Sequence, residues 1–404
     1  MLTQKFIAKI EGHGELAADF KNEKARLVTH EGERLFEGIL VGRAAEEAYW
    51  ITPRICGVCP VAHNLASLSA VEDAYGIKVN ETTRQLRLLM KCGQNLQSHV
   101  LHLFFLALPD YLGTDSGLEL ETKNPRAFKN ALILKNIADK IVYAAGGRNV
   151  HPTTTTMGGF NKIPNKNELQ TLLNEMEKTA KTAEWTAELS QKLEYPELKT
   201  DLEFIVIKNK KIFSNKNESV NIKNYKENIL EETRDYGTAK FGKFNSPSGK
   251  REVMAGALAR IALSKNSAET AKKYRLDFNN PFHNIPAQLI EILKYHKLAV
   301  KIVKKLLTAK MDGVIAKPSH NPPLRGVGAI EAPRGGLYHE IHLNEKGIIT
   351  YANIITPTVQ NLSSIEKSAN TLLKQTQNKT ETERKKLLIM LIRAYDPCLS
   401  CAAH

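Results

Sequence analysis

The stretch "DPCLSCAAH", residues 396–404, closes the sequence with two cysteines and a histidine. A chain end usually frays unless other groups hold it. Cys398 and Cys401 have the C-x-x-C spacing with which one tight turn presents two thiolates to one ion. The stretch "RICGVCPVAHN", residues 54–64, contains a second such pair, Cys56 and Cys59. Together the two pairs predict a metal that holds the end of the chain.

The spacing of the cysteines leaves the identity of the metal open. Four thiolates suit zinc, an iron–sulfur cluster or nickel. Two C-x-x-C pairs most often form a structural zinc site, and two unrelated thiol pairs are the other ordinary interpretation. Zinc ribbons, however, place their pairs near one another, whereas hundreds of residues separate these two. The separation favours a large buried centre that joins the two ends of the chain.

The composition is that of a globular protein, with 404 residues, 42% hydrophobic and 25% charged. No apolar run reaches the roughly 18–20 residues of a membrane helix. The first 20 residues alternate and include acidic side chains, unlike a signal peptide. Five cysteines are too few for a disulfide scaffold. We expect a soluble, cytoplasmic protein with reduced cysteines and no membrane span.

The net charge of +14 raises the question of a nucleic-acid partner. The excess is concentrated in Lys/Asn-rich stretches such as residues 206–228. No nucleic-acid-binding motif accompanies it, so a solvated basic face is the preferred interpretation.

The hydrophobic periodicity predicts a mainly α-helical protein with small antiparallel β-sheets, an α+β fold in a single domain over residues 1–404. Strands are expected in a hairpin within 3–30, at 201–207, and as a pair within 336–358 that turns at "NEKG". The helix over 81–108 should be N-capped by Asn80 and end before Pro109. The other helices are expected near 43–50, 61–77, 126–146, 166–193, 252–264, 283–311 and 379–394.

A stripe of chemically active side chains lies on the helix expected over 81–108. Cys92, Asn95, His99 and His102 are spaced 3, 4 and 3 residues apart, so they share one face. A polar core face near the active centre is the preferred interpretation, and a second metal site is the alternative.

The residues around the cysteines add a family resemblance. The two cysteine stretches resemble those of the large subunit of nickel–iron hydrogenases, and further matches run in order along nearly the whole chain. These are "IEGHGE" (10–15), "RLFEGILVGR" (34–43), "SHVLHLFFLALPD" (98–110), "MGGFNKIP" (157–164), "EAPRGGLYHEI" (331–341) and "IITPTVQN" (354–361). The pattern looks most like the cytoplasmic NAD(P)-linked or sulfhydrogenase branch, and the deazaflavin-reducing branch is similar. The resemblance implies the large-subunit fold and reversible heterolytic cleavage of dihydrogen.

The resemblance also implies how the metals are held. Cys56 and Cys398 would be terminal ligands of nickel, and Cys398 would take the proton from dihydrogen. Cys59 and Cys401 would bridge nickel to an iron that carries carbon monoxide and two cyanides. His63 matches a histidine that donates to a bridging thiolate, although a histidine on a helix face is an ordinary alternative.

Four other residues receive roles from the same resemblance. Glu11 would relay the proton away, although Lys9 stands where the family often has arginine. Arg334 would lie over the open face of the metals and pair with Asp396. Thr358 would donate to one cyanide, and the backbone of Pro333–Arg334 to the other. Without the resemblance, these are a surface glutamate, a salt-bridged loop arginine, a turn aspartate and a strand threonine. Asp110 in "ALPD" looks like a family aspartate that lies near the arginine, and an ordinary turn aspartate after a proline is the alternative.

The resemblance gives the last histidine a partner as well. Glu37, the Ile354 carbonyl and His404 would bind a magnesium or similar divalent ion, whereas a surface glutamate and a frayed terminal histidine are the plain alternative. Family precursors often carry an extension that is removed after this histidine, and His404 is either such a processed end or an encoded one. A maturation endopeptidase and nickel chaperones would then be partners.

The sequence contains no dinucleotide-binding fingerprint and no P-loop. Beyond the two pairs, Cys92 is the one cysteine left, too few for iron–sulfur clusters. The resemblance therefore implies a small subunit with iron–sulfur clusters and further flavin/NAD(P) subunits. A rival hypothesis is a non-catalytic, zinc-stapled scaffold of the same fold. The four cysteines with Glu11, Arg334 and His404 argue against it.

Overall fold

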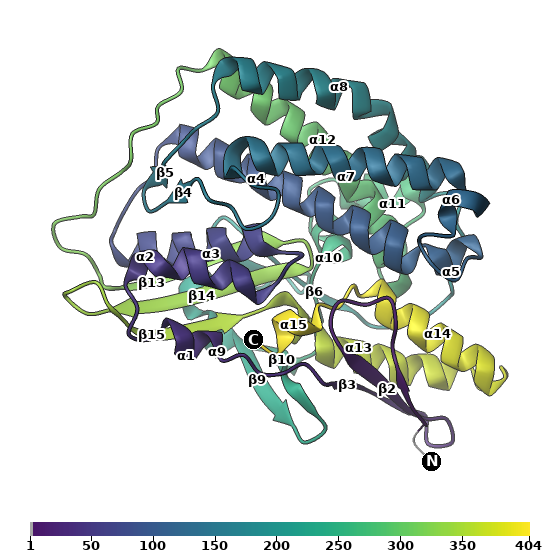
Figure 1. Ribbon diagram of the computed structural model, residues 1–404. Coiled ribbons are helices and arrows are strands. Elements are labelled where there is room, and N and C mark those ends of the chain that lie inside the picture. Colours follow the sequence, from purple (N-terminus) through teal and green to yellow (C-terminus); the bar gives the residue numbers. More distant parts are fainter. Residues whose placement is uncertain (1–2) are drawn as a thin grey trace.

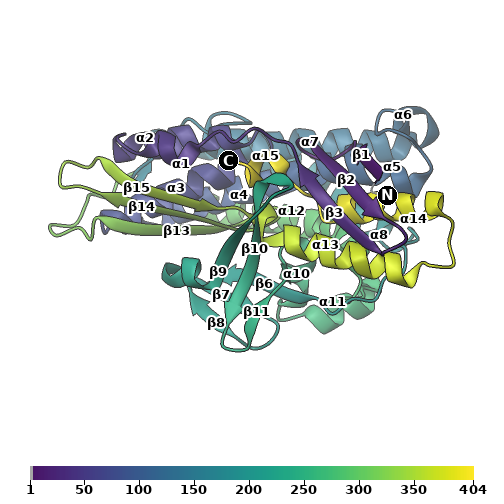
Figure 2. The same cartoon turned by 90° about the horizontal axis from the view of Figure 1, so that it is seen from below.

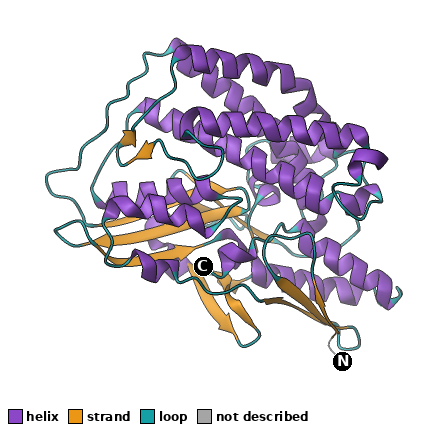
Figure 3. Ribbon diagram, in the orientation of Figure 1, coloured by secondary structure: helices purple, strands orange, loops and turns teal. Residues whose placement is uncertain are grey.

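The computed structural model describes residues 3–404, and helices form about half of it (Figures 1 and 3). A π-helical segment, Leu101–Ala107, continues α4, and short 3₁₀ turns occur at Thr52–Ile55, Ile222–Asn224 and Pro281–His283. The α-helices are α1 (Phe36–Leu40), α2 (Ala45–Ile51), α3 (Pro60–Ala74), α4 (Glu81–Val100), α5 (Pro109–Leu112), α6 (Leu120–Lys123), α7 (Pro125–Gly146), α8 (Lys166–Leu189), α9 (Tyr225–Asn228), α10 (Ala257–Ala262), α11 (Ser267–Tyr274), α12 (Asn284–Thr308), α13 (Pro357–Gln375), α14 (Glu381–Ala394) and α15 (Leu399–Ala402).

The strands form five small sheets. Their orders are β1-β2-β3, β4-β5, β12-β6-β7-β8, β11-β10-β9 and β13-β14-β15, and β6 and β12 form the one parallel strand pair among the described residues. The strands are β1 (Thr3–Phe6), β2 (Gly14–Asp19), β3 (Lys24–Thr29), β4 (Thr155–Thr156), β5 (Gly159–Phe160), β6 (Glu203–Lys208), β7 (Lys211–Ser214), β8 (Ser219–Asn221), β9 (Ile229–Arg234), β10 (Gly237–Ser246), β11 (Gly249–Arg251), β12 (Val253–Met254), β13 (Arg325–Ala332), β14 (Gly335–Leu343) and β15 (Ile349–Ile355).

The long helices α4, α7, α8 and α12 pack on one another in one part of the molecule, at the top of Figure 1. The sheet β13-β14-β15 lies below them, and α3 packs across its strands β13 and β14. In the view from below, the sheets that contain β6 and β10 lie near the right-hand end of the β13-β14-β15 sheet (Figure 2). The C-terminus ends among these layers, beside α15.

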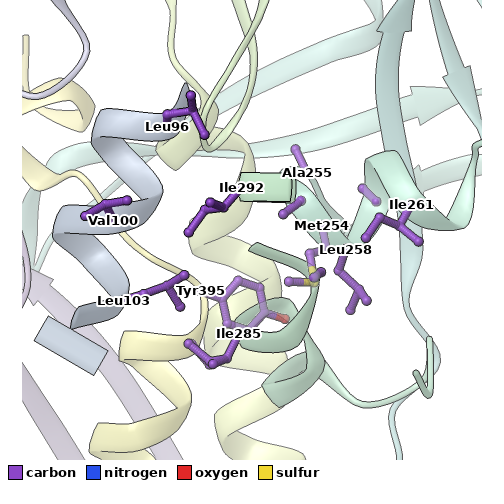
Figure 4. Packing of buried hydrophobic residues seen from close by; sticks show 14 of the residues in the cluster. Leu96, Val100, Leu103, Met254, Ala255, Leu258, Ile261, Ile285, Ile292 and Tyr395 are labelled. Carbon is purple, nitrogen blue, oxygen red and sulfur yellow. The ribbon is translucent and has the colours of Figure 1, made fainter. Parts of the chain in front are cut away.

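The core beneath the C-terminal segment is built from α4 and the elements that face it. The Asn80 side chain accepts a hydrogen bond from the Thr83 N–H and begins α4, as the sequence predicts. Apolar side chains of α4 and its π-helical continuation point toward Tyr395, which directly follows α14 (Figure 4). The cluster drawn there contains Leu96, Val100, Leu103, Met254, Ala255, Leu258, Ile261, Ile285, Ile292 and Tyr395.

Helix α3 lies almost directly on the backbone of β13. A Cβ on Gly326 would lie 2.0 Å from the Ala70 carbonyl oxygen, and a Cβ on Gly328 would lie 2.0 Å from the Ala66 carbonyl oxygen. Glycine in the strand and alanine on the helix therefore permit the contact. Since Cys59 is the N-cap of α3, this contact sets where the first cysteine pair lies.

The two ends of the chain meet beside that helix. Glu11 and Cys398 form a parallel β-bridge, and the Leu399 N–H donates to the Glu11 carbonyl oxygen at 3.0 Å. The turn between β1 and β2 thereby holds the segment that contains the second cysteine pair.

The predicted fold class is confirmed, and so is the hairpin at the N-terminus, to which β3 adds a third strand. Two local predictions were wrong. The strand pair within 336–358 ends at Ile355, so Thr358 lies in the first turn of α13, which Pro357 begins. The helix expected over 252–264 is strand β12 followed by the shorter helix α10.

The lysines of the stretch 206–228 agree with the predicted solvated basic face, because five of the six are exposed, while the same stretch buries Ile212 and Tyr225 in β7 and α9. Among residues 3–404, no helix combines the length and apolar character that crossing a membrane requires.

The close contact between α3 and β13 yields a stability prediction. In Gly328→Ala, the added carbon would meet backbone atoms of α3, so the helix must move. We expect the free energy of unfolding to fall by about 1–3 kcal/mol, measured by chemical denaturation. Gly38→Ala is the control, because a Cβ there meets nothing within 4 Å. Equal denaturation midpoints for wild type and Gly328→Ala would contradict the contact.

Candidate metal centre

All four cysteines of the two C-x-x-C pairs lie together. Cys56 ends a 3₁₀ turn, Cys59 caps α3, and Cys398 and Cys401 begin and line α15. The Sγ–Sγ distances are 3.5 Å for Cys56–Cys398, 3.3 Å for Cys59–Cys401 and 2.8 Å for Cys398–Cys401. The four sulfur atoms lie within 4.8 Å of one another, and every one of these residues is buried. This is the one such group of potential metal ligands found in residues 3–404.

The electrostatics of the four thiols fit a cation in their midst. Burial raises the pKa of the Cys398 and Cys401 thiols. Hydrogen bonds from the other three thiols lower the pKa of Cys56 well below its ordinary value. Burying sulfur charge is costly unless an opposite charge compensates it, and four sulfur donors suit a soft or borderline metal such as nickel.

A small enclosed cavity adjoins three of the four thiols. Cys59, Cys398 and Cys401 line it, whereas Cys56 does not. The remaining wall is formed by His63, Ala332, Pro333, Arg334, Leu337, Pro357 and Thr358.

Arg334 is fixed at this cavity by Asp396. Its Nη2 lies 2.7 Å from Asp396 Oδ1, and its Nε donates to the Asp396 carbonyl oxygen at 2.7 Å. Gln288 donates to the other carboxylate oxygen of Asp396 at 2.9 Å. Although burial opposes the charge, Asp396 and the cysteine sulfurs raise the pKa of Arg334 well above its ordinary value. A permanent positive charge therefore faces the thiol group.

A second arginine, which was not predicted from the sequence, holds the loop before Arg334. Arg260 on α10 donates to the carbonyl oxygens of Ala332 at 2.9 Å and Pro333 at 2.7 Å. It also pairs with Glu291 at 2.6 Å and Glu331 at 3.0 Å. No local motif marks Arg260, because its partners lie far away in the sequence.

Glu11 reaches the thiol group through Ser400. The Ser400 N–H donates to Glu11 Oε2 at 3.2 Å, and the Ser400 hydroxyl donates to Glu11 Oε1. The same hydroxyl oxygen lies 3.9 Å from Cys398 Sγ. Ser400 was not predicted as a site residue, although a hydroxyl inside a C-x-x-C motif is a visible signal.

Thr358 and His63 approach different sulfurs. The Cys398 N–H donates to Thr358 Oγ1 at 3.0 Å, which leaves the threonine O–H available to the cavity. His63 Nε2 lies 3.8 Å from Cys401 Sγ, and its Nδ1 lies 3.2 Å from His339 Nε2. Burial lowers the pKa of His63 to about 3 and that of His339 well below its ordinary value, so both rings are neutral at pH 7.

Glu37, Ile354 and His404 also come together. Glu37 Oε1 accepts from the Ile354 N–H at 2.7 Å and lies 3.9 Å from His404 Nε2. His404 Nε2 lies 3.0 Å from the Ile354 carbonyl oxygen, and Nδ1 lies 2.8 Å from the Cys401 carbonyl oxygen. Two oxygens and one imidazole nitrogen suit a divalent cation that keeps some waters.

Asp110 forms its ion pairs with two cations other than Arg334. Its carboxylate pairs with Lys9 at 2.7 Å and with Arg393 at 2.6 Å, rather than with Arg334. Arg393 also donates to the Ala8 carbonyl oxygen at 2.8 Å. These bonds tether the turn that leads to Glu11.

The polar stripe on α4 and its π-helical continuation is a buried core face, which was the preferred interpretation. His99 lies 2.9 Å from Glu291, and His102 lies 2.8 Å from the Arg393 carbonyl oxygen. Burial raises the pKa of Cys92 to about 12, so this thiol is inert.

Known proteins resemble the chain over its whole length. The nickel-dependent hydrogenase family matches residues 34–132 and 284–404. The alpha chain of sulfhydrogenase 1 of Pyrococcus furiosus is 33% identical, over 100% of this chain and 97% of the relative. A chain of the F420-non-reducing hydrogenase vhc of Methanococcus voltae is 30% identical, over 98% and 94%. The beta chain of the NAD-reducing hydrogenase HoxS of Cupriavidus necator is 26% identical, over 98% and 93%.

Solved structures agree with these matches. A crystal structure of an NAD⁺-reducing [NiFe]-hydrogenase in the H₂-reduced state superposes with a TM-score of 0.86 at 26% identity and covers 100% of both chains. The Ni-Fe-Se hydrogenase of Desulfovibrio vulgaris Hildenborough superposes with a TM-score of 0.78 at 21% identity, also over 100% of both chains, and shares the fold.

The grouping of Glu37, Ile354 and His404 yields a metal-binding prediction. After treatment with a chelator, Mg²⁺ should raise the thermal unfolding midpoint of the wild type, because a ligand at 100 times its Kd stabilises the folded state by about 2.7 kcal/mol. Glu37→Gln should lose this response, whereas Glu33→Gln, at an exposed position in the same segment, should keep it. A full response in Glu37→Gln would remove Glu37 from the site.

Proposed function

We propose that this chain, which belongs to the nickel-dependent hydrogenase family and is a large subunit of that family, carries out reversible heterolytic cleavage of dihydrogen. The chain is an oxidoreductase, as its relatives are. The observation that carries the proposal is the set of four sulfur atoms within 4.8 Å of one another beside the buried Arg334. When bound, a nickel–iron pair supplies the Lewis acidity that polarises dihydrogen.

The four cysteines hold the two metals in different ways under this proposal. Cys56 and Cys398 would hold nickel as terminal ligands, and Cys59 and Cys401 would be shared with an iron that carries carbon monoxide and two cyanides. The cavity supports the contact of Cys59 and Cys401 with a second metal and its small ligands, because both residues line it; Cys398 lines it as well, whereas Cys56 does not. The Thr358 O–H would donate to one cyanide, and in the Pro333–Arg334 segment the backbone N–H of Arg334 would donate to the other, because proline has no N–H.

Arg334 and the cavity wall prepare the site for a reactant without polarity. The guanidinium stays charged and planar, and Asp396 fixes its orientation. Pro333, Leu337 and Pro357 exclude water from the same cavity. The positive charge therefore acts at short range in an apolar space, where electrostatic effects are strongest.

The proton leaves through residues of the chain. Cys398 Sγ takes the proton, and the Ser400 hydroxyl passes it to the Glu11 carboxylate, since this hydroxyl contacts both groups. Ser400 and Glu11 are only partly buried, so this side of the centre is the one that leads toward solvent.

Electrons require other proteins. The four clustered cysteines and the inert Cys92 leave no thiol for an iron–sulfur cluster. We therefore propose a small subunit with such clusters, followed by flavin/NAD(P) subunits, in the cytoplasm. The names of the NAD-reducing relative and of the NAD⁺-reducing structure support this acceptor.

The same proposal assigns the remaining parts of the chain. Residues 1–404 act as one domain, and Glu37, Ile354 and His404 hold a divalent cation. A maturation endopeptidase and nickel chaperones assemble the centre.

Metal analysis of the purified complex tests the function. We expect one nickel and one iron per chain, with infrared bands of carbon monoxide and cyanide. One zinc without these bands would replace the proposal by the zinc-stapled scaffold. Identification of the subunits that co-purify then decides between NAD(P) and a deazaflavin as acceptor.

Arg334→Lys should retain nickel and iron but lower the turnover of dihydrogen by about 10²-fold or more. A point charge replaces the planar fork, so neither its geometry nor its bond to Asp396 is preserved. Arg325→Lys on β13, at a side chain that is 55% exposed, is the matched control. Normal turnover with intact metals would refute the role of Arg334.

Ser400→Ala should slow proton–deuterium exchange by on the order of 10²-fold, the usual contribution of one positioned proton carrier. Ser400→Thr retains the hydroxyl and should retain most of the rate. Glu11→Gln should reproduce the loss, and metal content should stay unchanged in all three variants. Unchanged exchange in Ser400→Ala would mean that Cys398 reaches Glu11 by another path.

A further inference from the structure

A buried chain of hydrogen bonds continues from the thiol group on the side away from Glu11. His63 Nε2 lies 3.8 Å from Cys401 Sγ, and His63 Nδ1 lies 3.2 Å from His339 Nε2. His339 Nδ1 lies 3.0 Å from Ser67 Oγ, which lies 2.7 Å from Thr52 Oγ1. We propose that His339 and Ser67 are positioning residues that hold His63 in the tautomer whose Nε2–H points at the Cys401 sulfur. The proposal deepens the proposed function, because it concerns a thiolate that the metals would share.

Three separate parts of the chain contribute the groups beyond the sulfur. Thr52 begins the 3₁₀ turn before Cys56, and His63 and Ser67 lie one turn apart on α3. His339 lies in the middle of β14, paired with Gly328 of β13 and Ile354 of β15. Gly328 is a residue at which α3 approaches the backbone of β13 closely. The packing that brings α3 onto the sheet therefore also brings His63 and Ser67 to His339.

The imidazole rings of His63 and His339 each carry one N–H proton, on either Nδ1 or Nε2. His63 and His339 are 1% exposed, and Thr52 and Ser67 are 0% exposed. Burial disfavours the charged form of an imidazole, and within residues 3–404 neither ring forms an ion pair with a carboxylate, so both rings are neutral. A neutral imidazole has one N–H and one lone pair, and the hydrogen bond at one nitrogen fixes the other.

The direction of the hydrogen bonds follows from the chemistry of the Cys401 sulfur. A thiolate bound to metal only accepts hydrogen bonds, so His63 must present Nε2–H to it. His63 Nδ1 then accepts from His339 Nε2–H, and His339 Nδ1 accepts from the Ser67 O–H. The Ser67 oxygen finally accepts from Thr52. Every donor and acceptor in the chain is used once.

If these hydrogen bonds all ran in the opposite direction, the Cys401 sulfur would lose its donor. The Thr52 O–H could instead donate to the His63 carbonyl oxygen, 3.3 Å away. Ser67 would then donate to Thr52, both rings would reverse, and His63 would turn a lone pair toward the thiolate. Ser67 and His339 thus determine whether the sulfur receives a hydrogen bond, and such a donor withdraws electron density from the metals.

The first test uses ¹⁵N NMR of histidine in the full chain loaded with zinc, which keeps the cysteines as thiolates and is diamagnetic. We expect His63 to carry its proton on Nε2 in the wild type. In Ser67→Ala, His339 Nδ1 loses its donor, and the fraction of His63 protonated at Nδ1 should rise. His342→Leu, on the same strand but with a side chain that is 36% exposed, should leave the His63 tautomer unchanged. A wild-type proton on Nδ1, or an unchanged tautomer in Ser67→Ala, would overturn the proposal.

The second test uses infrared spectra of the metal-loaded complex. His339→Leu should shift the carbon monoxide band to lower wavenumber, because the sulfur regains electron density. His339→Gln places an amide N–H near the former Nε2 and should restore the band. An unshifted band in His339→Leu with intact metal content would overturn the proposal. Absence of the bands from the wild type would instead refute the proposed function, and the zinc experiment would still decide the tautomer.

Discussion

Four sulfur atoms and a guanidinium share one buried space, and they can do so only because the two ends of the chain are held together there. Charge in an apolar interior is costly unless it is paired. Here Asp396 neutralises Arg334, and the sulfurs of Cys56 and Cys398, contributed by the two chain ends, are 3.5 Å apart. The group is therefore incomplete without a cation. Several contacts in the surrounding fold hold this costly arrangement in place.

These contacts hold each segment of the site separately. Gly328 lets α3 lie on the sheet and thereby places Cys59. Arg260 donates to the carbonyl oxygens of the two residues before Arg334. These bonds hold the loop in the conformation that directs the Arg334 guanidinium toward the thiol group. On the other side, Asp110 binds both Lys9 and Arg393, and this pairing fixes the turn that ends at Glu11. None of these residues contacts the sulfurs. Each of them holds a segment that contains a cysteine or that faces the thiol group.

Local signals and the cysteine motifs allowed much of this to be predicted. Asn80 caps α4 because capping needs only a neighbour three residues away. Pro357 starts a helix where alternation suggested a strand, since proline at the first helical position leaves the pattern of the preceding strand intact. The pair of Asp110 with Arg393 was not predicted, because tertiary packing decides which arginine a carboxylate meets. Ser400 and His339 were missed for a similar reason, as their roles depend on partners 389 and 276 residues away.

The two hydrogen-bonded sides of the thiol group differ in where they lead. Ser400 and Glu11 are partly exposed, so a proton received from Cys398 has a route outward. The chain through His63, His339 and Ser67 is closed, since it stays buried and ends at Thr52, beside a helix carbonyl. A proton that entered it would charge a buried ring without reaching water. Continuous hydrogen bonding therefore does not by itself make a proton path. On the Cys401 side it fixes the direction of a dipole, and on the Cys398 side it can carry a proton away.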